Sequence, residues 1–133
     1  MRPGPQDITM YQGDDFEFIF RVRAAVLDID GVTWIPGSYV DLTGYTLLKA
    51  QCRLNEASGT VLVEYTCALL TQSGATLGGV IISATKTVVG ALTVNASPET
   101  LRYGMWDFQM TNTASKQQTY LKGDVFLLPE VTR

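Results

Sequence analysis

Hydrophobic and polar residues alternate along several segments of this chain, and this period of two constrains the fold more than any other feature. In residues 15–26, Phe16, Phe18 and Phe20 share one phase, and Glu17 lies on the other. Successive side chains of a strand point to opposite faces, so the alternation predicts a strand with one face in a core. The same pattern predicts strands at residues 45–54, 60–69, 102–112 and 119–128.

Turn sequences separate these segments. The cluster at 55–59 is expected to join its two neighbours as an antiparallel hairpin. A short strand is expected at 80–83, a helical turn within 84–92, and an edge strand at 32–35 that ends at Pro36. The pattern predicts an all-β, immunoglobulin-like antiparallel β-sandwich of about seven strands with one short helical turn. A length of 133 residues suits a single β-sandwich domain over 1–133.

The predicted core is formed by the apolar phase of these strands. Cys52 and Cys67 fall on that phase, where a small buried thiol is the usual role. Replacing a large member such as Trp106 is expected to be strongly destabilising. The predicted members are Phe16, Phe18, Phe20, Leu48, Cys52, Val63, Tyr65, Trp106, Phe108 and Val125.

Charge and hydropathy exclude several function classes. The net charge is -3 and the basic residues are scattered along the sequence. A continuous row of lysines and arginines that could bind the phosphates of a nucleic acid is therefore not expected. The apolar runs are too short to span a bilayer, and no signal peptide is expected, so the chain is predicted to be made and kept in the cytoplasm. Only 17% of the residues are charged, which suggests that a partner covers part of the surface.

The catalytic inventory is narrow. The chain has no histidine, which removes Ser-His-Asp and Cys-His catalysis and histidine-ligated zinc. No Gly-rich phosphate loop is present, and neither cofactor nor metal is expected. The strongest enzymatic alternative is a two-carboxylate glycosidase, and the sequence gives no sign that two of its carboxylates converge. Its candidates are Asp14, Asp15, Asp28, Asp30 and Asp107.

Three further signals have a structural and a functional interpretation. Residues 28–31 (DIDG) begin like a calcium loop, but a third alternating ligand and a downstream glutamate are missing, which favours a plain turn. Trp106 lies on the core phase, although a carbohydrate-binding face is the alternative. Trp34 lies in the long loop beside Ile35, either as a lid over the core or as an anchor for a partner.

The N-terminal residues 1–7 are expected to form an extended arm. Pro3 and Pro5 lack the N–H donor, so residues 2–5 are not expected to join a regular ladder. Prolines also reduce the entropy lost on docking. The arm is therefore predicted to contact a neighbouring molecule and to add little to the stability of its own subunit.

Short motifs follow one another along nearly the whole chain. They are YQGDDF at 11–16, DLTG at 41–44 followed by AQCR at 50–53, YGMWDFQ at 103–109, LKGDV at 121–125 and a terminal VTR. In this order and spacing they resemble a family of small tailed-bacteriophage virion proteins. The chain is similar to the N-terminal domain of baseplate upper proteins, which holds receptor-binding or fibre proteins on the phage tail.

The resemblance implies a non-enzymatic structural protein of the virion. Because no fibre-forming extension follows the domain, a tail, baseplate or fibre-attachment adaptor is the first hypothesis. A capsid decoration (cement) protein and a carbohydrate-binding module are the alternatives. Expected partners are other virion proteins and further copies of the chain in a homo-oligomer, with no nucleic acid and no membrane. The expected partner-binding residues are Arg2, Pro3, Pro5, Trp34, Ile35 and Arg133.

Overall fold

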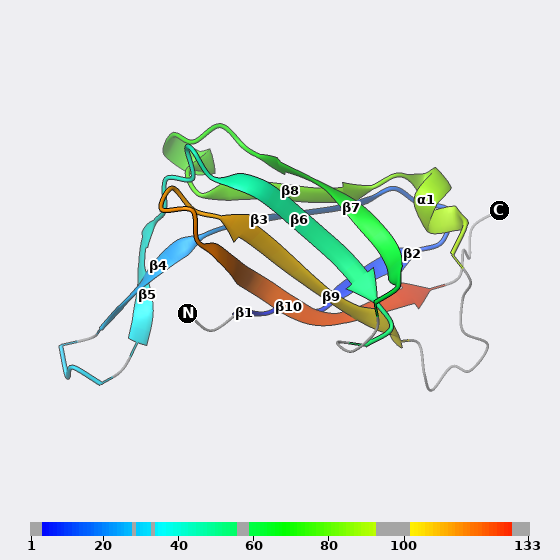
Figure 1. Cartoon of the computed structure of the whole chain (residues 1–133), viewed down its shortest axis with the longest axis horizontal. Coiled ribbons are helices and arrows are strands. Elements are labelled where there is room, and N and C mark those ends of the chain that lie inside the picture. The colour runs from blue at the N-terminus through cyan, green and yellow to red at the C-terminus, as the bar shows by residue number, and fades with distance from the viewer. Residues whose placement is uncertain (1–3, 28, 33, 56–58, 93–101, 129–133) are drawn as a thin grey trace.

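The computed structural model describes residues 4–27, 29–32, 34–55, 59–92 and 102–128. Most of them lie in strands (Figure 1). In chain order the elements are β1 (Gly4–Pro5), β2 (Ile8–Tyr11), β3 (Phe16–Arg21), β4 (Arg23–Leu27), β5 (Trp34–Tyr39), β6 (Thr46–Arg53), β7 (Val61–Leu69), the 3-10 turn η1 (Gly74–Thr76), β8 (Gly79–Ala84), α1 (Lys86–Gly90), β9 (Arg102–Thr111) and β10 (Gln117–Leu128).

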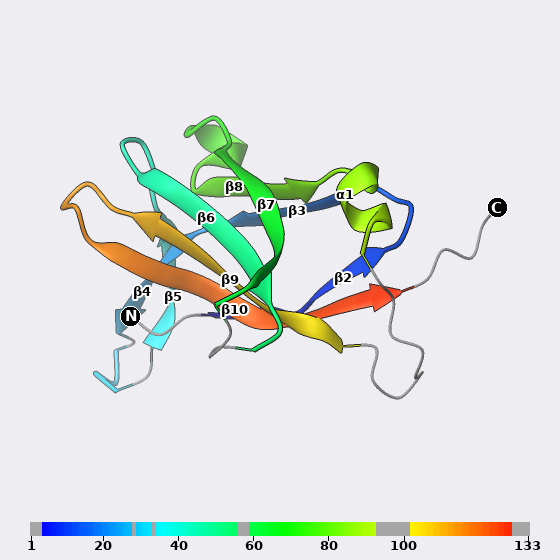
Figure 2. The same cartoon turned by 45° about the vertical axis from the view of Figure 1, so that its right-hand side comes forward.

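The strands form an all-β, immunoglobulin-like sandwich. The main sheet has the order β1-β10-β9-β6-β7-β8-β3, and β2 also pairs with β10. It folds over so that β3, β8 and β7 form one layer, and β6, β9 and β10 form the other (Figure 2). These two groups correspond to the B-E-D and C-F-G strands of an immunoglobulin fold.

One strand belongs to both layers. Residues 61–65 of β7 pair with β6, whereas residues 66–69 pair with β8. A long strand that changes partners halfway turns the corner between layers without a break in the ladder. The predicted hairpin between β6 and β7 is confirmed, and so is the helical turn, which is α1.

The N-terminal strands correct one expectation. Residues 2–5 were not expected in a ladder, but Gly4 and Pro5 pair in parallel with β10, and Gln6 N donates to the carbonyl of Lys122 at 3.0 Å. Pro5 is tolerated because β1 is an edge strand and needs few donors. Residues 1–3 lie outside the described residues, and the expectation of a neighbouring partner stays a prediction.

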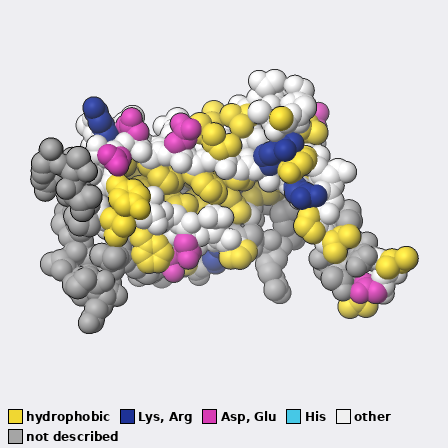
Figure 3. All heavy atoms as spheres, turned by 180° about the vertical axis from the view of Figure 1, so that it is seen from behind, with side chains coloured by type: hydrophobic (Ala, Val, Ile, Leu, Met, Phe, Trp, Pro, Cys, Tyr) yellow, Lys and Arg dark blue, Asp and Glu magenta, His cyan; other side chains and the backbone are white. Residues whose placement is uncertain are grey.

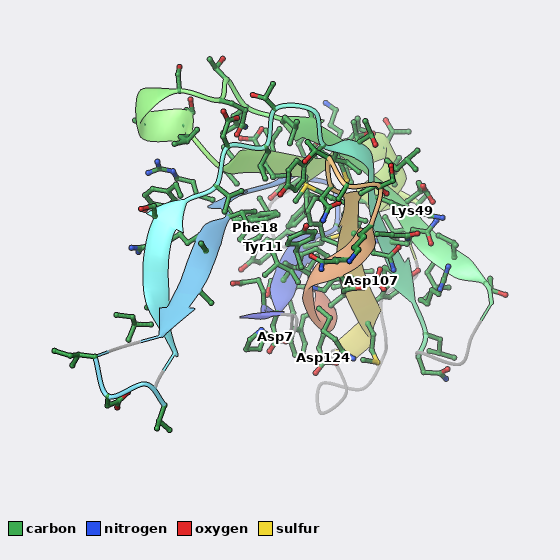
Figure 4. All side chains as sticks on the ribbon, turned by 60° about the vertical axis from the view of Figure 1, so that its left-hand side comes forward. Asp7, Tyr11, Phe18, Lys49, Asp107 and Asp124 are labelled. Atoms are coloured by element: carbon green, nitrogen blue, oxygen red, sulfur yellow. The ribbon has the colours of Figure 1, made fainter. Side chains whose placement is uncertain are left out.

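The break between β1 and β2 is held by two specific hydrogen bonds. The indole Nε1 of Trp106 donates to the Gln6 carbonyl at 2.6 Å, and the Asp124 amide donates to Oδ1 of Asp7 at 2.9 Å. Figure 4 shows Asp7 and Asp124 beside each other. The Gln6 carbonyl occupies the space that a side chain at Gly123 would need. These contacts indicate that the arm stabilises its own subunit, contrary to the expectation from sequence.

The core lies between the layers and is crossed by aromatic pairs. Phe18 meets Trp106 edge-on, with ring centroids 6.3 Å apart. Phe20 meets Phe108 in the same way at 5.2 Å, and such pairs add to the energy of burial. Buried members are Ile8, Met10, Leu42, Ala50, Cys52, Val63, Tyr65, Val80, Ile82, Ala84, Val89, Trp106, Phe108, Met110, Val125 and Leu127.

Four predicted core members are only half-buried. They pack against the core from the sheet's margins and are Phe16, Phe18, Phe20 and Leu48. For β3 the reason is its position, because the sheet ends there and β8 is its only neighbour among the described strands. Figure 3, drawn from behind, shows hydrophobic side chains along the body. Leu54, placed on the apolar phase by the alternation, follows the end of β6 and is 56% exposed.

Two more strands differ from the sequence prediction, and irregular strand pairing explains both differences. The segment 15–26 forms two strands, since Val22 donates to the Gly78 carbonyl and the chain then leaves the sandwich as β4. Pro36 does not end the expected edge strand, because among the described strands β5 pairs with β4 alone and continues to Tyr39. The β4–β5 hairpin projects from one end of the body (Figures 1 and 2).

The close approach at Gly123 gives the first prediction. An alanine Cβ there would overlap the Gln6 carbonyl oxygen, so Gly123→Ala must displace the N-terminal strand. We expect a loss of about 1–3 kcal/mol in the free energy of unfolding by urea denaturation. Gly90→Ala is the control, because nothing lies within 4 Å of its added Cβ. A Gly123→Ala variant as stable as the wild type would contradict the assigned packing.

The second prediction concerns Trp106, which is 2% exposed. Trp106→Ala should lower the free energy of unfolding by about 3–5 kcal/mol, as for other buried aromatics. Trp106→Phe keeps an apolar ring but leaves the Gln6 carbonyl without the indole donor, so about 1–3 kcal/mol should be lost. Thermal and urea unfolding measure both. A melting temperature of Trp106→Ala within about two degrees of the wild type would show that the ring is not in the core.

Candidate functional site

A pocket with both polar and apolar side chains in its wall lies on the outer face of the layer formed by β6, β9 and β10. Its volume is about 330 Å³. The outward phase of each strand supplies most of the wall, which follows from the alternation of side chains. The lining residues are Gln51, Arg53, Asn55, Met105, Trp106, Asp107, Thr119 and Lys122.

A β-bulge in β10 completes this wall. Thr119 pairs with Gln109 and Leu121 with Phe108, so Tyr120 is the extra residue. The bulge lets Thr119 and Lys122 reach the same outer face although they are three positions apart. It also turns Tyr120 towards the core, where its ring lies 6.4 Å from that of Phe108. Uninterrupted alternation along 119–128 predicts Tyr120 on the outer face together with Lys122, and the bulge makes that prediction wrong.

A chain of hydrogen bonds holds the basic side of the pocket. Arg53 Nη2 donates to Gln51 Oε1 at 2.8 Å, and Gln51 Nε2 donates to Glu64 Oε2 at 2.6 Å. The Nε atom of Arg53 is buried and has no hydrogen-bond partner. An unused donor of this kind carries a desolvation cost. The arginine therefore has capacity to bind an additional acceptor.

Asp107 lies at the centre of this face, and Lys49 lies on the neighbouring strand (Figure 4). Burial raises the pKa of the Asp107 carboxyl above its ordinary value. Arg53, the amide of Gln109, Lys122 and Lys49 oppose that rise by favouring the charged form. The result is a partly buried carboxylate surrounded by cations.

Of the glycosidase candidates, Asp107 is the one found among the described residues of the pocket wall. Among the described residues that line the pocket, Asp107 is the only carboxylate. Asp15 Oδ1 instead accepts from the Lys86 amide at 2.6 Å, at the start of α1. Asp14 is exposed at the turn after β2, and Asp28 lies outside the described residues.

Residues 29–31 of the DIDG segment form a turn. The Asp30 carboxylate accepts from the Val32 amide at 2.8 Å, and Gly31 has φ of 72°, a backbone conformation that favours glycine. In the part of the chain that the structure describes, no three histidine, cysteine or acidic side chains cluster as metal ligands do.

Both cysteines are free thiols. Cys52 is buried and Cys67 is half-buried. Burial raises the pKa of Cys67 to about 11, so its thiol stays protonated near neutral pH. A protonated thiol is a poor nucleophile and a poor metal ligand.

None of the described helices has the length and apolar character needed to span a bilayer.

The second exposed feature is the β4–β5 hairpin. Its end carries Ile29, which is fully exposed, and Val32, which is 78% exposed. Hydrophobic and acidic side chains appear together at the end of this projection in Figure 3. Ile35, a predicted partner residue, is 37% exposed on β5. The backbone of Trp34 belongs to β5, and its side chain lies outside the described residues, as do Arg2, Pro3 and Arg133.

The base of this hairpin is fixed to the body. Arg21 lies 3.4 Å from the centroid of the Tyr39 ring and Arg23 lies 5.0 Å away, both as cation–π contacts. Arg21 Nε also donates to the Leu77 carbonyl at 3.0 Å. The Val40 amide donates to the Val22 carbonyl at 2.9 Å and closes the two strands where they leave the sandwich.

Sequence reasoning missed the pocket residues other than Asp107 and Trp106. Alternation along 45–54 places Gln51 and Arg53 on the polar phase of a strand and assigns them no further role. The available signal was that three neighbouring strands each carry polar or charged residues on one phase. Their convergence depends on register and on the bulge at Tyr120, which alternation alone does not reveal.

Comparison with known proteins gives no match to a protein-family model, and no curated protein is significantly similar in sequence.

The raised pKa of Asp107 gives the third prediction. The folded state binds this proton more tightly than the unfolded state, whose pKa is near 3.8. The free energy of unfolding should therefore fall as pH rises from that value through the raised pKa. Asp107→Asn should remove this part of the pH dependence in urea unfolding measured from about pH 4 to pH 7.

The neighbouring arginine allows a matched control. Arg53→Gln should raise the pKa of Asp107 further, whereas Arg53→Lys keeps the positive charge and should change it less. NMR titration of the Asp107 carboxyl carbon measures all three proteins. A wild-type pKa at or below the ordinary value would contradict the assigned burial.

Proposed function

We propose that this protein is a non-enzymatic structural subunit of a tailed-bacteriophage virion, made in the host cytoplasm and built into the tail, baseplate or fibre-attachment region as an adaptor. The observation that carries the proposal is the projecting β4–β5 hairpin with its exposed hydrophobic end. The resemblance of the short motifs to baseplate upper proteins is the reason for proposing a tailed-bacteriophage virion. The expected partners are other virion proteins and further copies of the chain.

A projecting hairpin of this kind needs a partner. Two strands alone are marginally stable in water, and the Ile29 side chain at the end of this hairpin is fully exposed. The hairpin base is nevertheless anchored by Arg21 and Tyr39. An element held in place at its base and apolar at its end is suited to insertion into a neighbouring subunit.

The motifs behind the resemblance form turns and strands of the scaffold. Gly13 and Gly44 have φ of 92° and 87°, which the turns before β3 and β6 require. The Asp41 carboxylate accepts from the Thr43 amide and hydroxyl at 2.9 and 2.6 Å, and these bonds lower its pKa. These residues shape the domain, in agreement with a structural role.

The chemistry of the pocket favours binding over catalysis. Its described lining holds one carboxylate and no cysteine, and the chain has no histidine. A carbohydrate-binding module needs an exposed aromatic platform, but the only aromatic residue among the described lining residues is Trp106, whose ring is buried in the core. A capsid decoration role uses the same features and differs in its place in the particle.

The fourth prediction tests this function. In a tailed phage that carries the gene, virions purified on a density gradient should contain the chain in several copies per particle, measured by quantitative mass spectrometry. A tagged chain should appear in a low-resolution cryo-EM map at the tail or baseplate. Tagged copies on the head surface would assign the decoration role instead. Absence of the chain from purified particles would contradict the proposal.

A further inference from the structure

The end of the β4–β5 hairpin combines apolar and acidic character. Ile29 and Val32 are exposed, and Asp30 lies between them in the turn. Figure 1 and Figure 2 both show this end directed away from the sandwich. The hairpin end is therefore a short knob with acidic and aliphatic side chains.

The pocket has the complementary character. Its wall carries the basic Arg53 and Lys122 against the single carboxylate of Asp107, although the whole chain has a net charge of -3. Met105 adds apolar surface to the wall, and Leu54, adjacent to Arg53 in sequence, is exposed. Arg53 also has a donor without an acceptor. A carboxylate beside an aliphatic side chain matches these groups.

We propose that the hairpin end of one copy docks in the β6–β9–β10 pocket of the next copy, with Asp30 facing Arg53 and Ile29 against the apolar wall. The inference rests on the proposed function and names the contact through which the subunits associate. The knob and the pocket are different surfaces of the same chain, so the contact is heterologous and repeats from copy to copy. Such contacts build a closed ring when the rotation between copies permits it.

The fifth prediction is a charge exchange between two variants. Asp30→Lys and Arg53→Glu should each weaken self-association by at least about tenfold, because each places like charges at the contact. In an equimolar mixture, contacts between unlike variants join opposite charges again, either Asp30 with Arg53 or the two replaced residues, whereas contacts between like variants stay repulsive. The mixture should therefore associate more strongly than either variant alone. Sedimentation velocity over a concentration series measures all the samples.

Matched controls separate the contact from general charge effects. Lys116→Glu makes the same charge change as Arg53→Glu at the β9–β10 turn, and Asp14→Lys matches Asp30→Lys at another exposed turn. Both should associate as the wild type does. Asp30→Asn keeps an oxygen that can accept from the Val32 amide, so it should weaken association less than Asp30→Lys. Circular dichroism should show the same fold in every variant.

Three results would overturn the docking proposal. They are a wild-type chain that stays monomeric at all concentrations, a mixture that associates no more strongly than either variant alone, and an Ile29→Ser variant that weakens association while Arg53→Glu does not. The third result would mean that the hairpin end binds a surface other than the pocket. Incorporation into virions is measured separately, so a monomeric chain that still purifies with particles overturns self-docking and leaves the proposed function standing.

Discussion

Trp106 makes the contacts on which the rest of the structure depends. It joins its own layer to the opposite layer and to the N-terminal strand. Its ring lies in the core between the two layers and meets Phe18 of the opposite layer. Its indole N–H reaches the Gln6 carbonyl and fixes the N-terminal strand on β10. Burial of a large aromatic ring and satisfaction of its one polar atom thus depend on the same geometry. Gly123 completes it by leaving room for the Gln6 carbonyl.

The core also determines where the pocket and the β4–β5 hairpin lie. The pocket exists because β6, β9 and β10 are held side by side, with a bulge that turns Thr119 and Lys122 to one face. The hairpin keeps its direction because the chain leaves the sandwich at a hydrogen-bonded point. There the Val22 amide binds the Gly78 carbonyl, and Gln72 accepts from the amides of Leu42 and Gly78. A firm scaffold thereby carries two surfaces of opposite character at separate places.

The sequence predicted the strands well where the apolar face was continuous. The alternation around Trp106 and Phe108 places both in the core, and the β6–β7 hairpin follows from its turn cluster. The sequence was less informative where a strand pairs with another strand that is distant along the chain. The parallel pairing of β1 with β10 joins residues that lie more than a hundred positions apart, and its only local sign was a glycine inside a strand, Gly123.

The sequence by itself determined the class of fold, the absence of histidine chemistry and the faces of most strands, because these depend on composition and on a period of two within each segment. The tertiary structure alone decided which outward faces meet. A single extra residue, Tyr120, shifts the phase of β10, and the position of β3 at the end of the sheet leaves its aromatic rings half-buried. Register, bulges and sheet edges arise between strands rather than within them, so the pocket and the projecting hairpin became visible only once the strands were assembled.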